Sequence, residues 1–430
     1  MKVLVLGGYG LIGTAIVRAL LQAGHHVIGL ARSRQQGERL IPEAAWIGAD
    51  IAALTEPGDW QPHLQGIDAV VNASGVLQSG LGDHVSRTQG DAIIALVAAC
   101  EAAKIQTFVQ ISAPGVSPTA DTEFYRSKAA ADAAVMASRL NWTIFRPGLV
   151  LAPQAYGGTR LLRMLAACPV IVPIALADAK IQCVSVEDVA EAVTSAISGD
   201  FARKDFDLVE REAHSLEALV LHIRRWMGLP APNIVVRIPQ AIARGISLIA
   251  DVAGWLGWRS GLRSTALTVL ARDVVGDGAR WTDASGHSFK SLRETLRDLP
   301  ATSQERVAAR GALVFPLLLF VFSAFWVASG AIAIWQAEAA MAVVMPVLSS
   351  GWGATFVLGG AVIDIVIGLA ALVRPLTRMA LLASILVAGA YLAGSLFVAP
   401  GLWADPLGPI VKVFPAMALS VALLALNTDR

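Results

Sequence analysis

Hydrophobic positions follow two different patterns along this chain of 430 residues. Up to about residue 210, short apolar runs alternate with longer stretches in which apolar side chains recur at helical spacing. The short runs predict buried strands and the longer stretches predict amphipathic helices. Beyond residue 310, long apolar stretches follow one another with few charges, which is typical of membrane-spanning helices. The pattern predicts an α/β part followed by an all-α membrane part.

The first part predicts a doubly wound parallel sheet of the Rossmann type. Helical patterns lie between its strands, around 87–103 and 127–139, and another ends at Gly24. Alternating strands and helices imply a parallel sheet that binds its ligand at the carboxyl ends of the strands. The predicted strands lie in KVLVL, HHVIGLARS, AAWIGAD, DAVVNASG, TFVQIS and WTIFRPG.

Glycines connect the first predicted strand to the first predicted helix, in GGYGLIG. Gly7 permits a tight turn, Gly10 lets the backbone approach a pyrophosphate, and Gly13 lets helix and strand pack closely. The phosphates would then lie on the helix N-terminus, among free N–H groups that include those of Leu11 and Ile12. Because a strand precedes this loop and a helix follows it, the loop predicts dinucleotide binding.

The end of the second strand bears on the choice of cofactor. A site that prefers NAD places an acidic residue there, which holds the ribose 2′-hydroxyl. This chain has Arg32, followed by Ser33 and Arg34, and these residues suit a 2′-phosphate. NADP(H) is therefore favoured over NAD(H), with a solvated surface arginine as the alternative.

Further candidate residues share a place at the carboxyl ends of the predicted strands. Asp50 and Ile51 could edge the adenine, and the hydroxyl of Ser112 could point at the nicotinamide side. The other candidates at these strand ends are Asn72, Ala73, Ser74, Gly75 and Pro147.

About the first 210 residues resemble the extended or atypical short-chain dehydrogenase/reductase superfamily. The resemblance rests on GGYGLIG, ADI, NASG, QISAPG, FYRSKAAAD, RPG and VSVEDVAEAV. In that superfamily a serine, a tyrosine and a lysine form the catalytic set. The resemblance assigns Ser112 and Lys128 to the serine and the lysine, and it places Phe124 where the tyrosine belongs. It is strongest to the atypical branch that includes the accessory subunit of respiratory complex I.

The missing tyrosine leaves the chemistry open. Tyr125 lies one residue after the position of the family's tyrosine. Each residue of a helix is rotated by about 100° from the one before it, so Tyr125 should point away from where Phe124 points. Phe124 has no ionisable proton, so general acid catalysis from that position is lost. A shifted helix register would restore Tyr125. Alternatively, Lys128 supplies the proton, or it only clamps the cofactor.

Two boundaries are predicted, which give segments 1–232, 233–305 and 306–430. The middle segment mixes apolar residues with arginines and has Trp255 and Trp258 close together. A helix from about Pro239 could lie flat at a membrane surface. The alternative is a substrate-side cap of the dehydrogenase fold, and both can hold at once.

Four membrane spans are predicted in the last segment, since each apolar stretch has about the twenty residues needed to cross a bilayer. Arginines lie before the first span, between the second and third, and at the end of the chain. This bias predicts a multi-pass protein of the bacterial inner membrane with both termini cytoplasmic. The spans are Leu313–Trp335, Gly351–Val373, Met379–Val398 and Leu407–Leu426.

Asp364 lies near the middle of the second predicted span, where an ionisable group is costly and should face the bundle interior. It is either a quinone or proton site or a structural hydrogen bond between helices. The four spans and GLAALVRPLTR after this acid resemble the DoxX-like membrane family, some relatives of which are associated with quinone reduction.

The charge and the histidine and cysteine positions argue against nucleic-acid binding and against a metal site. The formal net charge is +1, so the sequence shows no electrostatic footprint for nucleic acid. The seven histidines form no HExxH pair and the three cysteines follow no CxxC spacing, so no metal site is predicted. The N-terminus has no secretory signal pattern.

Two hypotheses follow for function. The first is a membrane-anchored NAD(P)H-dependent oxidoreductase that reduces a lipophilic carbonyl or a quinone. The second is a catalytically silent NADPH-binding structural or sensor subunit that supports a membrane partner. A cap on a small transporter is a weaker third, and association with a second copy stays open.

Overall fold

The computed structural model describes residues 1–427 except 81–82, 346 and 348. The chain divides into two compact units. The first unit consists of Met1–Gly254 and Ser260–Glu305. The second unit consists of Trp255–Arg259 and Arg306–Arg430.

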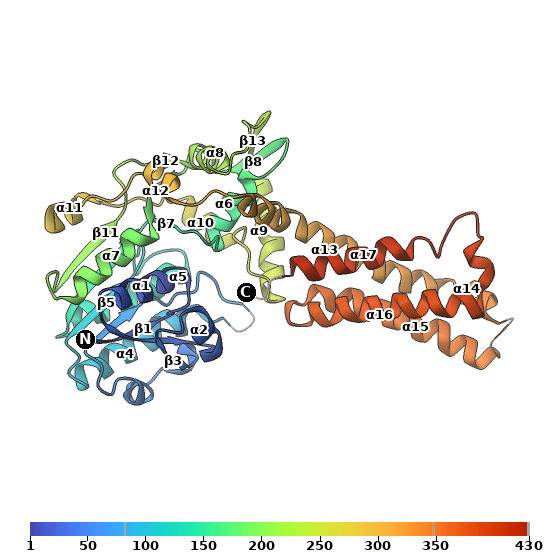
Figure 1. The fold of residues 1–430 in the computed structure, drawn as a ribbon, viewed down its shortest axis with the longest axis horizontal. Helices are drawn as coiled ribbons and strands as arrows, with labels where there is room; N and C mark the ends of the chain where they lie inside the picture. The colour runs from blue at the N-terminus through green and yellow to red at the C-terminus, as the bar shows by residue number, and fades with distance from the viewer. Residues whose placement is uncertain (81–82, 346, 348, 428–430) are drawn as a thin grey trace. The chain divides into compact units, whose positions relative to one another are not determined.

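A seven-stranded parallel sheet forms the core of the first unit (Figure 1). Its order is β11-β6-β5-β4-β1-β2-β3, so the direction of winding reverses between β1 and β4. The predicted doubly wound fold is confirmed, and β11 is a strand that the sequence patterns missed. The strands are β1 (Lys2–Leu6), β2 (His26–Ala31), β3 (Ala45–Gly48), β4 (Ala69–Asn72), β5 (Thr107–Ile111), β6 (Asn141–Pro147) and β11 (Lys204–Leu208).

Helices cover both faces of this sheet. Side chains alternate along a strand, so Val3 and Val5 of β1 join one buried cluster and Leu4 and Leu6 join the other. Both clusters are apolar because a parallel sheet is buried on its two faces. The first cluster includes residues of α1 (Leu11–Gln22) and α7 (Val186–Ile197), and the second includes residues of α4 (Ala92–Ala102) and α5 (Glu123–Ala137).

The remaining elements of the first unit include three two-stranded pairs, β10 with β7, β12 with β9, and β13 with β8. Buried Glu210 joins parts of this region, since its carboxylate accepts the N–H groups of Cys183 at 3.0 Å and Leu292 at 2.6 Å. The elements are α2 (Arg34–Leu40), α3 (Pro57–Trp60), β7 (Leu149–Leu151), α6 (Gly157–Ala166), β8 (Ile171–Ala175), β9 (Lys180–Ile181), β10 (Cys183–Ser185), β12 (His214–Ser215), α8 (Leu216–Trp226), β13 (Ile234–Ile238), α9 (Gln240–Trp255), α10 (Ser264–Leu270), α11 (Ala279–Ser285) and α12 (Leu292–Asp298).

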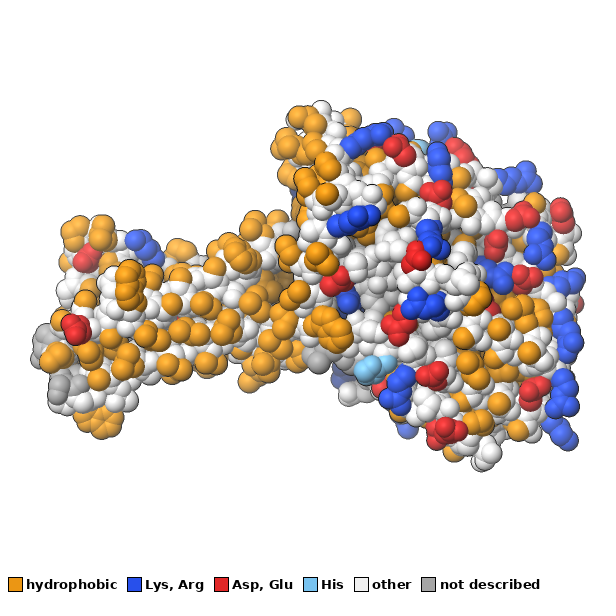
Figure 2. Space-filling view, turned by 180° about the vertical axis from the view of Figure 1, so that it is seen from behind, with side chains coloured by type: hydrophobic (Ala, Val, Ile, Leu, Met, Phe, Trp, Pro, Cys, Tyr) orange, Lys and Arg blue, Asp and Glu red, His pale blue; other side chains and the backbone are white. Residues whose placement is uncertain are grey.

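The second unit is helical and largely apolar on its surface (Figure 2). Three of its helices, α13, α15 and α16, are long and apolar enough to cross a membrane. The fourth predicted span, Leu407–Leu426, is helical only in its last 14 residues, which form α17. Pro406, Gly408 and Pro409 lie around its predicted start and do not favour a helix there. The helices are α13 (Ser303–Trp335), α14 (Ala337–Val344), α15 (Ser350–Leu372), α16 (Arg374–Val398) and α17 (Val413–Leu426).

Glycines allow α13 and α15 to approach closely. A Cβ added at Gly330 would lie 2.3 Å from the carbonyl oxygen of Ala361. A Cβ added at Gly368 would lie 2.9 Å from the carbonyl oxygen of Ser323. Such small residues are what helix packing in a bilayer requires, because close backbone contact replaces the hydrophobic driving force.

We expect Gly330→Ala to lower the stability of the helical unit by about 1–3 kcal/mol, because the new methyl group overlaps a backbone carbonyl of α15. Thermal unfolding in detergent measures the change. Gly359→Ala is the matched control, since a Cβ at Gly359 meets no described atom within 4 Å. Equal melting temperatures for the two variants would contradict the packing argument.

Candidate active site

The glycine-rich turn between β1 and α1 forms the floor of the site. Gly7 has φ +69°, a conformation that favours glycine, and its carbonyl accepts the N–H of Gly10 at 2.8 Å. A Cβ added at Gly13 would lie 2.1 Å from the carbonyl oxygen of Gly7. Only glycine at position 13 therefore lets α1 start directly on the end of β1.

The N-terminus of α1 faces the carboxyl edge of the sheet with bare amides. Gly10 is the N-cap, and no side chain caps this helix. The N–H groups of Leu11, Ile12 and Gly13 belong to the first turn, which has no intrahelical acceptor. With the positive end of the helix dipole, they fit a pyrophosphate group, so the residues present suit a dinucleotide.

Arg32 lies just beyond β2, at the predicted ribose position. Its guanidinium Nη1 is 2.9 Å from Oδ1 of Asp83, and its side chain is half-exposed. The N–H of the next residue, Ser33, donates to the hydroxyl of Tyr9 at 3.2 Å. A bound 2′-phosphate would contact Arg32 close to the carboxylate of Asp83.

Predicted residues after β4 form a buried polar network. The Asn72 amide donates to Gln110 Oε1 at 2.9 Å, while its oxygen accepts the N–H of Ser74 at 3.1 Å. The carbonyl oxygen of Ala73 would lie 2.9 Å from a Cβ at Gly7. The structure thus brings the backbone after β4 against the glycine turn, as the doubly wound fold requires.

Three other predicted residues have local structural roles. Asp50 caps the short helix Ile51–Ala53, because its Oδ1 accepts the N–H of Ala52 at 3.2 Å. Ile51 is buried in a core cluster, and Pro147 ends β6 beside Leu208 of β11. Their contact with a cofactor stays a prediction.

Lys128 is a buried cation on α5. Its Nζ donates to the carbonyl of Ile111 at 2.9 Å and lies 5.7 Å from the ring centroid of Phe124. A Cβ added at Gly75 would be 3.8 Å from the same Nζ. Burial lowers the pKa of Lys128 to about 8, and the nearby carboxylate of Asp132 opposes this shift. The lysine therefore lies where the β4 and β5 ends meet, with a pKa near neutrality.

Ser112 directs its hydroxyl to an acid that the sequence patterns did not single out. Its Oγ donates to Oδ2 of Asp132 at 2.6 Å, and Gln110 donates to Oδ1 at 3.4 Å. Burial raises the pKa of Asp132, while the hydrogen bond from Ser112 and the charges of Lys128 and Arg146 oppose the rise. Asp132 lies one helical turn after Lys128, a spacing that sequence inspection could have found.

Tyr125 is buried, and its hydroxyl lies close to Gly115. A Cβ added at Gly115 would be 3.8 Å from the Tyr125 oxygen. Burial raises the pKa of Tyr125, and the charge of Arg272 opposes the rise. The ring next to Lys128 is that of Phe124. The catalytic roles of Ser112, Tyr125 and Lys128 stay predictions.

Gln89 is a central residue that no sequence signal identified. It lies in the π-helical turn Arg87–Asp91, a local form that often marks functional sites. Its amide donates to Ser127 Oγ at 3.0 Å and to the carbonyl of Phe124 at 3.2 Å, and its Oε1 accepts the N–H of Val76 at 3.3 Å. Gln89 thus connects α5 to the loop after β4.

The middle segment contacts the loops at the sheet's carboxyl edge. Arg263, just before α10, donates to the carbonyl of Ser79 at 2.9 Å and to Asp251 of α9 at 3.0 Å. Arg272, just after α10, forms an ion pair with Asp121. These contacts support the substrate-side cap among the two roles predicted for this segment.

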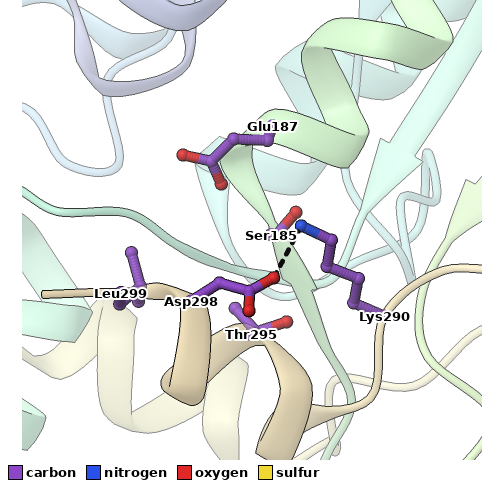
Figure 3. A pocket seen from close by; sticks show the side chains of 6 residues that line it. All are labelled: Ser185, Glu187, Lys290, Thr295, Asp298 and Leu299. Carbon is purple, nitrogen blue, oxygen red and sulfur yellow. Dashed lines mark ion pairs between the residues drawn. The ribbon is translucent and has the colours of Figure 1, made fainter.

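A surface pocket of about 160 Å³ lies between α7 and α12 (Figure 3). An ion pair between Lys290 and Asp298, 2.9 Å apart, lies in it. None of the lining residues is a predicted site residue. They are Ser185, Glu187, Lys290, Thr295, Asp298 and Leu299.

Asp364 of α15 is buried and joins three helices of the second unit. Its Oδ1 accepts the hydroxyl of Tyr391 at 2.8 Å from α16, and its Oδ2 accepts that of Ser329 at 3.0 Å from α13. A Cβ added at Gly360 would lie 3.0 Å from the Tyr391 oxygen, so glycine leaves room for this hydroxyl. The acid faces the interior as predicted, and its hydrogen bonds fit the structural alternative.

Taken with its fold, this site defines an NAD(P)-binding oxidoreductase fold of the short-chain dehydrogenase/reductase type, joined to a membrane domain. Residues 7–200 match the family model of NAD(P)H-binding domains, and residues 323–421 match the DoxX-like family. The chain thus carries an NAD(P)H-binding domain and a DoxX-like domain, which confirms both resemblances. The preference for NADP(H) stays a prediction.

Relatives match parts of the chain. The chain is 33% identical over 119 residues to 2-alkyl-3-oxoalkanoate reductase of Stenotrophomonas maltophilia, covering 27% of this chain and 34% of that protein. It is 41% identical over 75 residues to the photosystem II assembly factor Ycf39 of Synechocystis, covering 17% of this chain and 22% of that protein. The chain therefore spans about a third or less of the length of these two relatives.

Solved structures share the fold at low identity. UDP-glucuronic acid 4-epimerase from Bacillus cereus, in complex with UDP-glucuronic acid and NAD, has a TM-score of 0.51 and 16% identity, covering 69% of this chain and 97% of that one. UDP-glucose 4-epimerase from Thermotoga maritima has a TM-score of 0.52 and 15% identity, covering 71% and 98%. These likenesses establish the fold alone.

Replacing Arg32 tests the predicted cofactor preference. We expect Arg32→Ala to raise the Kd for NADPH about tenfold and to leave that for NADH nearly unchanged, because only NADPH carries the 2′-phosphate. Calorimetry on the full chain in detergent measures both constants. Asp83→Asn is the matched control, which keeps Arg32 and should not raise the Kd for NADPH. An equal loss for both cofactors would contradict the assignment.

Proposed function

We propose that this protein is a membrane-anchored, NADPH-dependent reductase of a lipophilic carbonyl compound or quinone. The observation that carries the proposal is the buried Lys128 ammonium at the carboxyl edge of the sheet, with a pKa lowered to about 8 by burial. A general acid works best when its pKa lies near the operating pH. The relative named 2-alkyl-3-oxoalkanoate reductase supports an apolar oxo substrate.

When bound, NADPH would supply the hydride that turns the C=O carbon into an alcohol carbon. The substrate oxygen must then gain one proton. Lys128 would release that proton from Nζ and become a neutral amine, which solvent protonates again. Ser112 is less suited to donate, because its hydrogen is engaged by Asp132. The Ile111 carbonyl would hold the Lys128 side chain in place throughout.

A second candidate function is an NADPH-binding subunit without catalysis. The observation that favours it is the Phe124 ring beside Lys128, at the position where the superfamily has its tyrosine. Lys128 would then only hold the cofactor. The relative named as a photosystem II assembly factor shows that a matching domain occurs in a protein with a non-enzymatic name.

The membrane domain would anchor the reductase in the bacterial inner membrane. The arginines near the span ends support cytoplasmic termini and a cytoplasmic dehydrogenase domain. In that arrangement the cofactor comes from the cytoplasm and the substrate comes from the lipid phase. Asp364 would either contact a quinone or stabilise the bundle through Tyr391 and Ser329.

Turnover by the full chain in lipid nanodiscs distinguishes the two candidates. We expect NADPH oxidation with a long-chain 3-oxo ester or a short-chain quinone, and we expect Lys128→Ala to lower kcat about 100-fold. Tyr125→Phe is the matched control and should retain activity if Lys128 is the acid, because the ring beside Lys128 is that of Phe124. NADPH binding without turnover on either substrate, followed by a gain of turnover in Phe124→Tyr, would establish the silent subunit instead.

The pH profile gives an independent test of Lys128. The protonated amine is the active acid, so kcat should be highest below the pKa and should fall as the pH rises through about 8. Stopped-flow measurement of NADPH oxidation between neutral and alkaline pH follows this change. A kcat that rises or stays level across that range would remove Lys128 as the proton donor.

A further inference from the structure

The helix α9 is amphipathic in a way that leaves one face uncovered. Its inner face consists of small buried residues. They are Ala243, Ser247, Ala250 and Gly254. Its outer face carries large apolar side chains with exposed fractions of 44% to 73%. They are Ile242, Ile246, Leu248, Ile249 and Val252.

The strand that precedes the helix, β13, also carries exposed apolar side chains. Ile234 and Val236 of β13 alternate along one side of the strand and are 52% and 36% exposed. Ile234 pairs with Ile171 of β8, which is also exposed, next to exposed Val170. These residues and the outer face of α9 form what we call the apolar strip. Contiguous exposed apolar surface of this kind marks an interaction site.

Charge on α9 favours a lipid surface as the partner. The helix has two charged residues, Arg244 and Asp251. Asp251 turns toward Arg263 and accepts its Nε–H at 3.0 Å, so the acid is used within the first unit. Arg244 is exposed and can reach lipid headgroups. An apolar face flanked by a basic residue is the pattern of a helix that lies in the membrane interface.

The C-terminal end of α9 leads directly into a membrane-domain segment. Residues Trp255–Arg259 belong to the second unit. There the Trp258 indole donates to the carbonyl of Leu372 at 2.6 Å, and the N–H of Arg374 donates to the carbonyl of Leu256 at 2.9 Å. Leu372 and Arg374 lie where α15 ends and α16 begins. The residues after α9 are therefore held at one end of the spans, where interfacial tryptophan and arginine are typical.

We propose that the apolar strip is embedded in the bilayer leaflet at that end of the spans, as a second, monotopic membrane contact of this chain. Continuity with the span ends identifies the lipid bilayer as the partner. A second consequence concerns the site. A Cβ at Gly80 would lie 3.0 Å from the carbonyl oxygen of Gly254, so α9 contacts the loop after β4. Embedding α9 places this loop of the cofactor edge beside lipid.

Fluorophore quenching by lipid tests the contact without any assay of turnover. A label is attached at Ile249→Cys in the full chain, in nanodiscs of phosphatidylethanolamine and phosphatidylglycerol. Spin-labelled lipid with its nitroxide near the headgroup serves as the quencher. Native Cys100, Cys168 and Cys183 are buried and should not be labelled in the folded protein. The control label is Met136→Cys, which is 44% exposed on α5 and lies outside the strip.

We expect the label at position 249 to be quenched at least about threefold more strongly than the label at 136, with a blue-shifted emission. Equal weak quenching at both positions would overturn the proposal. A blue shift at 249 that depends on protein concentration and resists spin-labelled lipid would overturn it in favour of a second copy. Because the readout is independent of NADPH oxidation, its failure and that of the proposed function can be told apart.

Discussion

The approach of Gly13 to the carbonyl of Gly7 is the constraint on which the cofactor edge depends. A single methyl group at position 13 would fall 2.1 Å from that oxygen. Because Gly13 has no side chain, α1 begins directly at the end of β1, and the uncapped N–H groups of its first turn lie at the carboxyl edge of the sheet. The ends of β4 and β5 lie at the same edge of the sheet, where the polar side chains of Asn72, Ser74 and Lys128 are buried.

Sequence patterns predicted the first six strands of the sheet and its glycine turn because these features depend on local rules, and they missed β11. Apolar runs before GGYGLIG specify a buried strand and a helix start without reference to the rest of the chain. The network of Gln89, Gln110 and Asp132 could not be predicted in this way, because its members come from distant elements and follow no period. The fourth span was overestimated, since hydropathy alone did not register Pro406 and Gly408.

The chemistry of the site depends on a balance between burial and charge around Lys128. Burial disfavours the ammonium, whereas Asp132 one turn away favours it. The ring of Phe124 fills the adjacent position with an apolar face that still attracts a cation. Phenylalanine at position 124 offers no hydroxyl as a proton donor, while the buried Lys128 keeps its hydrogen bond to the carbonyl of Ile111.

The middle segment has one side that contacts the first unit and another that is exposed. Its inner contacts, from Arg263 to Ser79 and Asp251, lie within the first unit. Its outer side chains gain nothing from that unit, and leaving them in water costs free energy in proportion to their area. A helix with one side in contact with protein and an exposed apolar side is suited to the boundary between water and lipid. The contacts of Trp258 with Leu372 and Arg374 hold the residues that follow α9 at one end of the spans.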